Sequence, residues 1–190
     1  MLRALKIFLT LAAGIALGLA FTWATTIRGT QGGSIGDGPW HTSLLTGSSD
    51  SGRYLRAFIA VHALLALSRE ETVYYIARDD SDGHPLDGRC SYRVEGRDPP
   101  ARWWSITAYG ADDFLIENAA DRYSVSMNSV TRHPDGTFAV TLSQKQAEGD
   151  WIPVAAERFD LMIRLYNPKA AVVADPAGVP LPTISKASCE

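Results

Sequence analysis

The sequence predicts an antiparallel β-sandwich behind an N-terminal membrane-spanning helix, with one further α-helix between them. Two observations lead to this mainly β fold class. Residues 7–27 contain no charged side chain, whereas after residue 71 apolar and polar residues alternate in short runs separated by turns. The sequence does not alternate strands with helices as a nucleotide-binding fold does, and no internal repeat is visible.

The composition limits the function classes. The 190 residues suffice for one domain with a hydrophobic core, and 46% hydrophobic with 21% charged residues exclude a disordered tail or a multi-span membrane protein. A net charge of −3 and the absence of a Lys/Arg stripe argue against a nucleic-acid partner. No acidic residue lies in residues 1–28, so the acidic character belongs to the rest of the chain.

Residues 1–28 have the composition of a membrane anchor. The uncharged segment 7–27 has the length that crosses about 30 Å of hydrocarbon as a helix. Arg3 and Lys6 precede this segment and Arg28 follows it. The positive-inside rule therefore places the N-terminus in the cytoplasm and the body in the periplasm, behind a single pass of the inner membrane.

A cleaved signal peptide is the alternative interpretation of the same segment. It has the required positive start and apolar stretch, and Gly18-Leu19-Ala20 offers small residues for cleavage. Against cleavage, apolar residues continue to Ile27, and Trp23 lies where an interfacial aromatic residue is expected. Both interpretations place the body outside the cytoplasm.

A linker and a helix are expected between the anchor and the strands. Residues 29–52 are rich in Gly, Ser and Thr, which is typical of a flexible spacer, and Trp40 is a candidate to dock on the body. In residues 53–68 the apolar residues recur at helical spacing, and His62 on this apolar face is interpreted as a core histidine. The β-sandwich domain with its lead-in helix therefore covers residues 53–190.

The remaining elements follow from period-two patterns and turn signals. Pro and Gly in His133-Pro134-Asp135-Gly136 favour a turn, as do Asp80-Ser81-Asp82-Gly83 and Asp87-Gly88. The Pro- and Ala-rich tail 167–182 is expected to be extended. The predicted strands are 72–78, 90–94, 102–109, 123–130, 137–143 and 159–166.

Cys90 and Cys189 are the two cysteines of the chain. In an oxidising compartment an even number of thiols favours a disulfide, which would close a loop of about 100 residues and stabilise the fold by ~4 kcal/mol. Two unpaired thiols are the alternative. A cysteine nucleophile is not expected, because no base accompanies either residue.

Motifs for common chemistries are missing. The sequence has no phosphate-binding Gly-x-x-x-x-Gly-Lys loop and no Gly-x-Ser-x-Gly elbow, and its histidines form no pair at metal-ligand spacing. The stretch from Asp79 to Gly83 resembles the start of a calcium loop, but the closing bidentate Glu is absent, so a turn is expected. No cofactor and no metal are predicted.

Three acids form the basis of an enzyme hypothesis. Asp112, Asp113 and Glu117 could supply the carboxylate pair that hydrolyses a glycan-like or small-molecule substrate. The simpler interpretation is a loop with solvated acids. No catalytic residue is therefore assigned.

Aromatic residues in the strand region form the more informative group. Trp103 and Trp104 lie on opposite faces of one strand, so both cannot fill the same core. An aromatic platform with a few polar groups suits apolar or sugar-like ligands, although Trp103 could simply cover the sheet beneath the tail. The candidate binding residues are Arg102, Trp103, Tyr109, Asn118, Trp151 and Arg164.

A family resemblance rests on an ordered set of motifs within residues 50–185. They are Ala101-Arg102-Trp103-Trp104-Ser105-Ile106-Thr107-Ala108-Tyr109, Asn118, Arg122-Tyr123-Ser124, Asp135-Gly136, Trp151-Ile152-Pro153, Phe159 and Arg164-Leu165-Tyr166-Asn167-Pro168. In these motifs the sequence resembles the bacterial domain-of-unknown-function family 1214 (DUF1214).

The resemblance implies a jelly-roll-like β-sandwich, which agrees with the periodicity. It also implies that larger relatives carry a second domain, of family 1254, before this one, where the present sequence has the apolar segment. It implies no activity and no catalytic residue.

The sequence thus predicts a membrane-anchored, exported β-sandwich that binds a glycan, a lipid or an envelope protein without catalysis. An envelope-associated enzyme that uses the loop acids is the alternative. A purely structural role in an envelope assembly is the third hypothesis.

Overall fold

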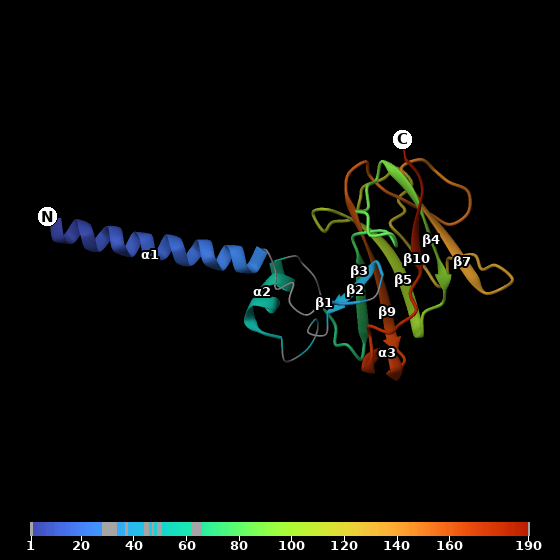
Figure 1. Cartoon of the computed structure of the whole chain (residues 1–190), viewed down its shortest axis with the longest axis horizontal. Coiled ribbons are helices and arrows are strands. Elements are labelled where there is room, and N and C mark those ends of the chain that lie inside the picture. The colour runs from blue at the N-terminus through green and yellow to red at the C-terminus, as the bar shows by residue number, and fades with distance from the viewer. Residues whose placement is uncertain are drawn as a thin grey trace. The chain divides into compact units, whose positions relative to one another are not determined.

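The computed structural model describes residues 2–27, 34–36, 38–43, 46, 48, 51–61 and 66–189. The chain divides into two compact units, one formed by Met1–Gly33 with Leu45–Ala66 and the other by Ser34–Leu44 with Leu67–Glu190. The first unit contains the two long helices, and the second contains all the described strands. Each unit is described by itself (Figure 1).

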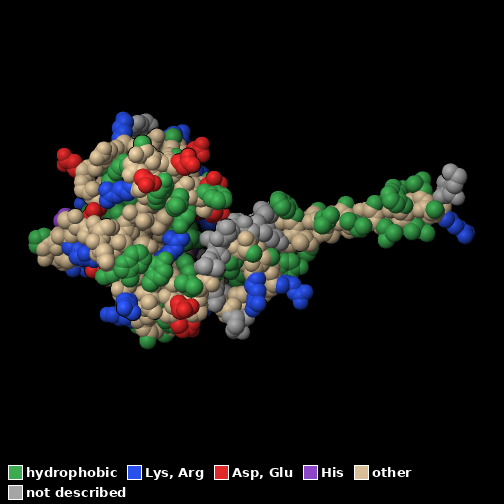
Figure 2. All heavy atoms as spheres, turned by 180° about the vertical axis from the view of Figure 1, so that it is seen from behind, with side chains coloured by type: hydrophobic (Ala, Val, Ile, Leu, Met, Phe, Trp, Pro, Cys, Tyr) green, Lys and Arg blue, Asp and Glu red, His purple; other side chains and the backbone are tan. Residues whose placement is uncertain are grey.

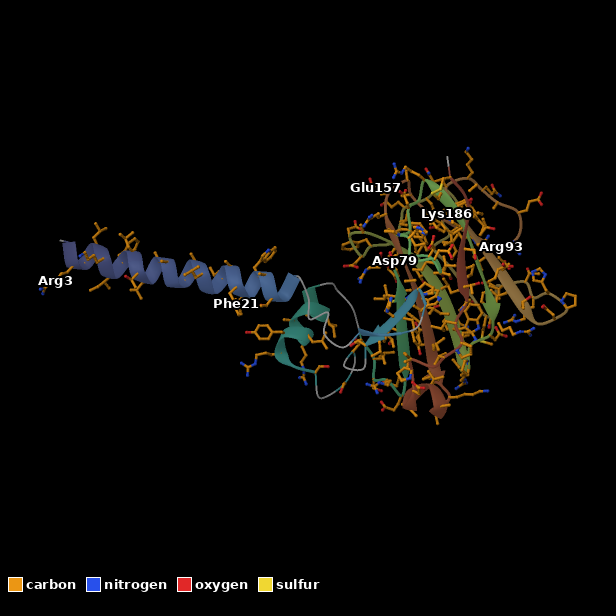
Figure 3. The ribbon with its side chains drawn as sticks, in the orientation of Figure 1. Arg3, Phe21, Asp79, Arg93, Glu157 and Lys186 are labelled. Atoms are coloured by element: carbon orange, nitrogen blue, oxygen red, sulfur yellow. A yellow bond between two sulfur atoms is a disulfide. The ribbon has the colours of Figure 1, made fainter. Side chains whose placement is uncertain are left out.

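Helix α1 (Leu2–Ile27) carries no charged side chain after Lys6. Its segment Arg3–Thr25 has a mean hydropathy of 2.1 and none of it is buried within the protein. The side chains of α1 project outward around the helix, as Arg3 and Phe21 do in Figure 3, and Thr10 and Thr25 bond back to the carbonyls of Lys6 and Phe21. Such a helix suits a membrane anchor or a signal sequence, because its polar groups are satisfied internally.

Helix α2 (Arg53–Val61) is shorter than the predicted helix 53–68. Residues 62–65, including His62, lie outside the described residues, and residues 66–68 are not helical, so the prediction was wrong there. Residues 68–72 form a turn that leads into the strand at Thr72–Ala77. In this turn the amides of Glu71 and Thr72 both donate to the Ser68 carbonyl.

Two packed sheets form the body, which confirms the antiparallel β-sandwich. Every strand pair is antiparallel except β7 with β8. The six-stranded sheet has the order β1 (Ser34–Ile35), β2 (Trp40–Ser43), β3 (Thr72–Ala77), β9 (Phe159–Pro168), β5 (Ala101–Gly110) and β6 (Ser124–Ser126). The four-stranded sheet has the order β10 (Thr183–Cys189), β4 (Cys90–Arg97), β7 (Thr137–Ser143) and β8 (Trp151–Pro153).

The core lies between the two sheets. Trp104 of β5 is fully buried and stacks on Phe138 of β7, with ring centroids 4.7 Å apart. The indole Nε1 of Trp104 donates to Asp98 Oδ1 at 2.9 Å, which satisfies its polar atom. Tyr92 of β4 contacts Phe159 of β9 edge-on at 5.9 Å. Aromatic residues from both sheets therefore hold the sandwich together.

The predicted linker contributes a strand to the body. Trp40 of β2 is 2% exposed and pairs with Ala77 of β3, and its Nε1 donates to the Pro182 carbonyl at 2.6 Å. Residues 40–43 are thus part of the sheet, although they fall within the predicted linker 29–52. A single strand of four residues in a Gly-rich stretch shows little periodicity, which is why composition suggested a spacer.

Two other segments differ from their predictions. Strand β6 covers only Ser124–Ser126 of the predicted strand 123–130, because the amides of Ser129 and Val130 both turn back to the Ser126 carbonyl. The tail that was expected to be extended contains a short helix, α3 (Ala170–Ala174). Asn167, with a φ of 45°, redirects the chain just before it.

Candidate functional site

The strands of the six-stranded sheet present one side to the core and the other side away from it. On β5, Trp104 and Ile106 are fully buried on the core side, whereas Trp103 and Tyr109 lie on the opposite side and are partly exposed. Hydrophobic and basic side chains lie next to one another on the surface of the body (Figure 2). We call the outer side of this sheet the aromatic face, with the members Tyr74, Trp103, Tyr109, Arg164 and Tyr166.

Arg164 is the cation of the aromatic face. In the strand register it lies between Tyr74 of β3 and Ser105 of β5. Its Nη2 donates to the Tyr109 hydroxyl at 2.7 Å and its Nη1 to Thr107 Oγ1 at 3.3 Å. The guanidinium carbon is 5.4 Å from the centre of the Tyr109 ring, which is cation–π distance. Among the described residues, no carboxylate forms an ion pair with Arg164.

An aromatic pair lies next to Arg164 along the strands. Trp103 and Tyr166 are paired in the register, and their ring centroids are 5.1 Å apart with planes tilted by 59°. Thr72 lies on the other side of Tyr166 in the same row and is 2% exposed. Its hydroxyl has no hydrogen-bond partner among the described residues, although buried hydroxyls normally have one. This end of the face therefore combines ring surface with an unpaired polar atom.

Acidic residues lie at the opposite end of the aromatic face. Asp160 of β9 pairs in the register with Tyr109, and its Oδ2 accepts a hydrogen bond from Arg78 Nε at 2.9 Å. Burial raises the pKa of Asp160 above its ordinary value, the cation of Arg78 opposes this, and the charges of Asp113 and Asp79 raise the pKa further. The face is therefore polarised, with Arg164 between the aromatic pair and the acids.

The outer side of the four-stranded sheet has a different character. In the register Arg93 of β4 lies between Thr141 of β7 and Ser185 of β10, and its Nε pairs with Glu95 Oε1 at 2.8 Å. Both charged side chains are about half exposed, at 49% and 48%, and Figure 3 labels Arg93 on this sheet. We call this side the polar face, with the members Arg93, Glu95, Ala139, Thr141 and Ser185.

Trp151 belongs to this second sheet. It pairs with Thr141 at the edge strand β8, is 7% exposed, and donates from Nε1 to the carbonyl and the hydroxyl of Ser143, both at 3.0 Å. The structure therefore does not bring Trp151 together with Trp103.

Two other predicted binding residues also lie off the aromatic face. Arg102 is exposed and shares the side of β5 that carries Trp104. Asn118 holds the loop after β5, because its Nδ2 donates to the Ile116 and Arg122 carbonyls and its Oδ1 accepts the Arg122 amide, all at 3.0 Å. Of the six predicted residues, the aromatic face unites Trp103, Tyr109 and Arg164.

Five residues of this region were not among the candidates from sequence: Thr72, Tyr74, Thr107, Asp160 and Tyr166. The alternation in β3 and β5 did indicate that Thr72, Tyr74 and Thr107 point away from the core. The strand order was the missing information, because β9 lies between β3 and β5 although it is distant from both in sequence. Register cannot be read from a single sequence, so the neighbours of Arg164 could not be named.

The acids of the enzyme hypothesis lie in the loop after β5. Asp112, Asp113 and Glu117 are all exposed. The Oδ1 atom of Asp112 accepts the Phe114 amide at 3.1 Å, which stabilises the turn. Asp113 adopts a φ of 66° in the same turn. These observations agree with the interpretation of solvated loop acids.

A second acidic group lies at the loop after β3. Asp80, Asp82 and His84 each place one possible ligand atom within 4.8 Å of the others. Asp80 is almost fully buried, and its Oδ1 accepts the amides of Asp82 and His84 at 3.0 and 2.9 Å. Its Oδ2 accepts no hydrogen bond among the described residues but lies 4.0 Å from Lys186 Nζ. The carboxylate thus holds the predicted turn and is balanced by a lysine.

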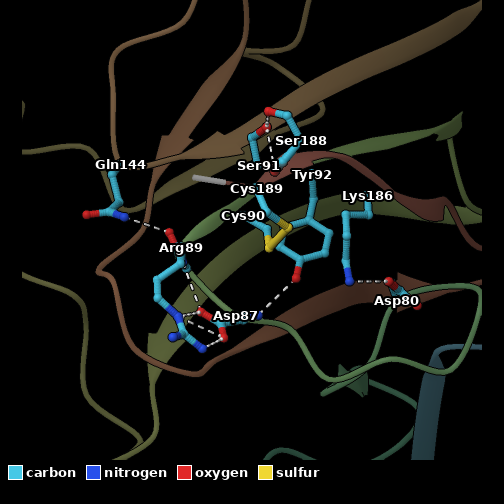
Figure 4. The surroundings of a disulfide bond; sticks show 11 residues. Asp80, Asp87, Arg89, Cys90, Ser91, Tyr92, Gln144, Lys186, Ser188 and Cys189 are labelled. Atoms are coloured by element: carbon cyan, nitrogen blue, oxygen red, sulfur yellow. Dashed lines mark hydrogen bonds and ion pairs between the residues drawn. A yellow bond between two sulfur atoms is a disulfide. The ribbon is translucent and has the colours of Figure 1, made fainter.

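The predicted disulfide joins Cys90 and Cys189. The two residues face each other across β4 and β10, so the bond fixes the C-terminal strand to the sheet (Figure 4). Next to it, Arg89 forms hydrogen bonds with the Asp87 carboxylate, which hold the pKa of Asp87 well below its usual range. The bond closes a sequence separation of 99 residues.

Comparisons with known proteins show what this chain is similar to in sequence and in structure. The sequence model described as "Protein of unknown function (DUF1214)" matches residues 71–170, and no curated protein matches the chain. The chain is similar in structure to the VPA0106 protein from Vibrio parahaemolyticus, with a TM-score of 0.61 and 24% identity over 73% of this chain and 36% of that one. An uncharacterised protein from Burkholderia cenocepacia gives a TM-score of 0.41 and 19% identity over 63% and 30% of the two chains. The chain thus spans about a third of the length of these proteins.

Proposed function

The chain belongs to the DUF1214 family of proteins of unknown function, and from this premise we propose that it is an exported, membrane-tethered domain that binds a ligand on its aromatic face. The family description gives no reaction, so the proposal depends on the chemistry of the fold. The binding surface is the outer side of β3, β9 and β5.

The location outside the cytoplasm is supported by two features. Helix α1 contains a 23-residue segment apolar enough to cross a membrane. The Cys90–Cys189 disulfide is of a kind that persists in oxidising compartments and is rare in the cytosol. With Arg3 and Lys6 before the apolar segment, the positive-inside rule favours a cytoplasmic N-terminus and a periplasmic body.

One observation carries the binding proposal: on the outer side of the six-stranded sheet, a partly buried guanidinium without a carboxylate lies against the Tyr109 ring, and an aromatic pair lies on the same side. Arg164 is positioned by the Tyr109 hydroxyl and Thr107, and the Trp103–Tyr166 pair lies in the neighbouring register row, on the side of Arg164 opposite to these contacts. A solvated sheet face needs none of these groups, because short polar side chains cover it equally well. Aromatic surface with a few positioned polar groups is typical of small-ligand sites.

The binding proposal is tested with the full-length protein in lipid nanodiscs. Isothermal titration calorimetry is run against envelope glycans, phospholipid vesicles and small apolar ring compounds. We expect at least one probe to bind, and Trp103→Ala to weaken that binding by about 10-fold, because an aromatic pair is worth about 0.5–1.5 kcal/mol beyond the apolar area that it buries. The matched control Thr141→Ala on the polar face should leave the affinity unchanged.

The proposal is contradicted if no probe binds, or if Trp103→Ala binds as well as the unmodified protein. A thermal unfolding curve of each variant shows whether a loss of binding reflects loss of the fold.

Membrane topology is a separate test. A C-terminal alkaline phosphatase fusion should be active and a fluorescent-protein fusion should not, because the phosphatase folds only after export. The mass of the mature protein distinguishes an anchor from a signal peptide: an intact N-terminus supports the anchor, and a product that begins after Ala20 supports cleavage.

A further inference from the structure

The aromatic face also restricts the charge of what it binds. Arg164 has five N–H donors, and two of them are used by Tyr109 and Thr107. The other donors have no acceptor among the described residues, and no carboxylate there balances the charge. A guanidinium held in this way presents a fork that matches the geometry of an anionic oxygen pair.

From this geometry, and resting on the proposed function, we infer that the ligand of the aromatic face is a small organic monocarboxylate, bound through its carboxylate to Arg164 and through its apolar body to the Trp103–Tyr166 pair. The carboxylate completes the hydrogen bonds of the guanidinium, and the ring pair covers the adjoining carbon skeleton. Arg164 and the ring pair occupy neighbouring rows of the same strands, but the guanidinium reaches from its row toward Thr107 and Tyr109. The ligand therefore lies along the strands, from the guanidinium to the ring pair.

A single negative charge fits the surroundings better than a phosphate does. Arg78, the next cation along the face, is already paired with Asp160 at 2.9 Å. Asp160 in turn is influenced by the negative charges of Asp113 and Asp79, so this end of the face disfavours additional anionic groups. One guanidinium without a carboxylate therefore compensates one negative charge. A phosphate group near pH 7 carries more than one negative charge and is usually bound by several cations.

Two contacts position the guanidinium rather than bind the ligand. The Tyr109 hydroxyl accepts from Nη2 while the Tyr109 ring lies 5.4 Å from the guanidinium carbon, and Thr107 accepts from Nη1. These contacts use one donor on each terminal nitrogen of Arg164. Tyr109 is therefore a positioning residue, and its hydroxyl should affect anionic ligands more than neutral ones.

The test compares two probes of the same shape and different charge, 2-naphthoate and the neutral 2-naphthamide, by calorimetry on the full-length protein in nanodiscs. We expect naphthoate to bind at least 10-fold more tightly than naphthamide, because a charge-assisted bidentate contact is roughly twice as strong as a neutral one. Arg164→Gln should weaken the binding of naphthoate by about 10-fold or more. It should change the affinity for naphthamide by less than about 3-fold. Arg164→Lys should be intermediate, since an ammonium lacks the planar fork.

Two further variants complete the experiment. Arg93→Gln makes the same substitution on the polar face and should change neither affinity. Tyr109→Phe should weaken the binding of naphthoate several-fold and leave the affinity for naphthamide unchanged. A general structural defect would lower both affinities.

The outcomes separate this inference from the proposed function. Equal binding of both probes, or naphthoate binding that survives Arg164→Gln, overturns the monocarboxylate assignment and leaves the aromatic face as a binding site. Tighter binding of 2-naphthyl phosphate than of naphthoate also overturns it. If neither naphthalene probe binds, and no other probe binds either, the proposed function fails as well.

Discussion

The two outer faces of the sandwich share their strand geometry but carry different side chains. The polar face is covered by short side chains, and its charged pair, Arg93 with Glu95, is about half exposed. On the aromatic face, Arg164 is held by hydroxyls and a ring instead of a carboxylate. The first arrangement is what solvation of a sheet requires, whereas the second leaves a partly exposed cation available to an anionic partner.

This difference separates residues that stabilise the fold from residues that are available for binding. The aromatic core residues Trp104 and Phe138 lie between the sheets and are almost fully buried. Trp103, one residue before Trp104, remains partly exposed on the other side of β5. Two neighbouring tryptophans should therefore respond very differently to substitution.

The largest expected effect tests whether the aromatic face is a second core. Trp104→Ala should lower the free energy of unfolding by about 3–5 kcal/mol, because it removes a fully buried ring and leaves a cavity. Trp103→Ala should cost only about 1 kcal/mol, the value of one partly exposed aromatic pair. Denaturant unfolding of the full-length variants measures both. Equal losses would show that Trp103 is a structural residue and would abolish the contrast between the faces.

The second effect concerns the sheet that carries the polar face. The Cys90→Ser/Cys189→Ser double variant should lose about 2–4 kcal/mol of stability, because the closed loop spans 99 residues and its constraint on the unfolded chain disappears. Probe affinity at the aromatic face should be unchanged in the folded protein, because the bond lies in the other sheet. A matching loss of affinity would show that the two faces are coupled.

A third effect is expected in the pH dependence of stability. Burial raises the folded-state pKa of Asp160, so stability should fall as the pH rises from the ordinary carboxyl range near 4 through that raised value. Asp98 behaves in the opposite way, because hydrogen bonds from Arg132 and Trp104 lower its pKa. The Asp98 carboxylate therefore stabilises the folded protein at a pH above the ordinary carboxyl pKa, and this stabilisation is lost as the pH falls through the lowered pKa of Asp98.

The measurement is the unfolding free energy of Asp160→Asn and Asp98→Asn between pH 3 and pH 8. Relative to the unmodified protein, Asp160→Asn should become more stable with rising pH, and Asp98→Asn less stable. The same slope for both variants would contradict the different environments of the two carboxyl groups.

The smallest effect is expected on the polar face. Glu95→Gln breaks the pair with Arg93, and because both side chains are about half exposed the stability should change by about 0–1 kcal/mol. The change should become smaller in high salt, which screens exposed pairs. A loss well above this range, insensitive to salt, would mean that the polar face is not merely a solvated surface.

Much of the fold could be predicted from local patterns. The alternation in β5, β7 and β9 is strong enough to assign Trp104, Phe138 and Ile163 to the core, and the structure confirms these assignments. The Cys90–Cys189 bond followed from an even number of cysteines in an exported chain. Strands β2 and β10 each contribute few buried apolar residues, mainly Trp40 and Ile184, so their periodicity was too weak to detect.

The candidate site could be predicted only in part. Trp103 and Tyr109 were assigned to one side of a strand because side chains alternate, and this was correct. Trp151 and Arg102 were grouped with them because aromatic and basic residues in strands look alike in sequence. Only the strand order shows that β8 belongs to the other sheet and that β9 places Arg164 next to Tyr74.

The contrast between the two faces is tested most directly by hydroxyl-radical footprinting of the full-length protein in nanodiscs, with and without saturating 2-naphthoate. Oxidation should decrease at Trp103, Tyr166 and Tyr74, which share the aromatic face. It should be unchanged at Phe114, whose side chain is 68% exposed in the loop after β5. Unaltered oxidation of the aromatic face at saturation, or protection confined to Phe114, would contradict the proposal that this face binds the ligand.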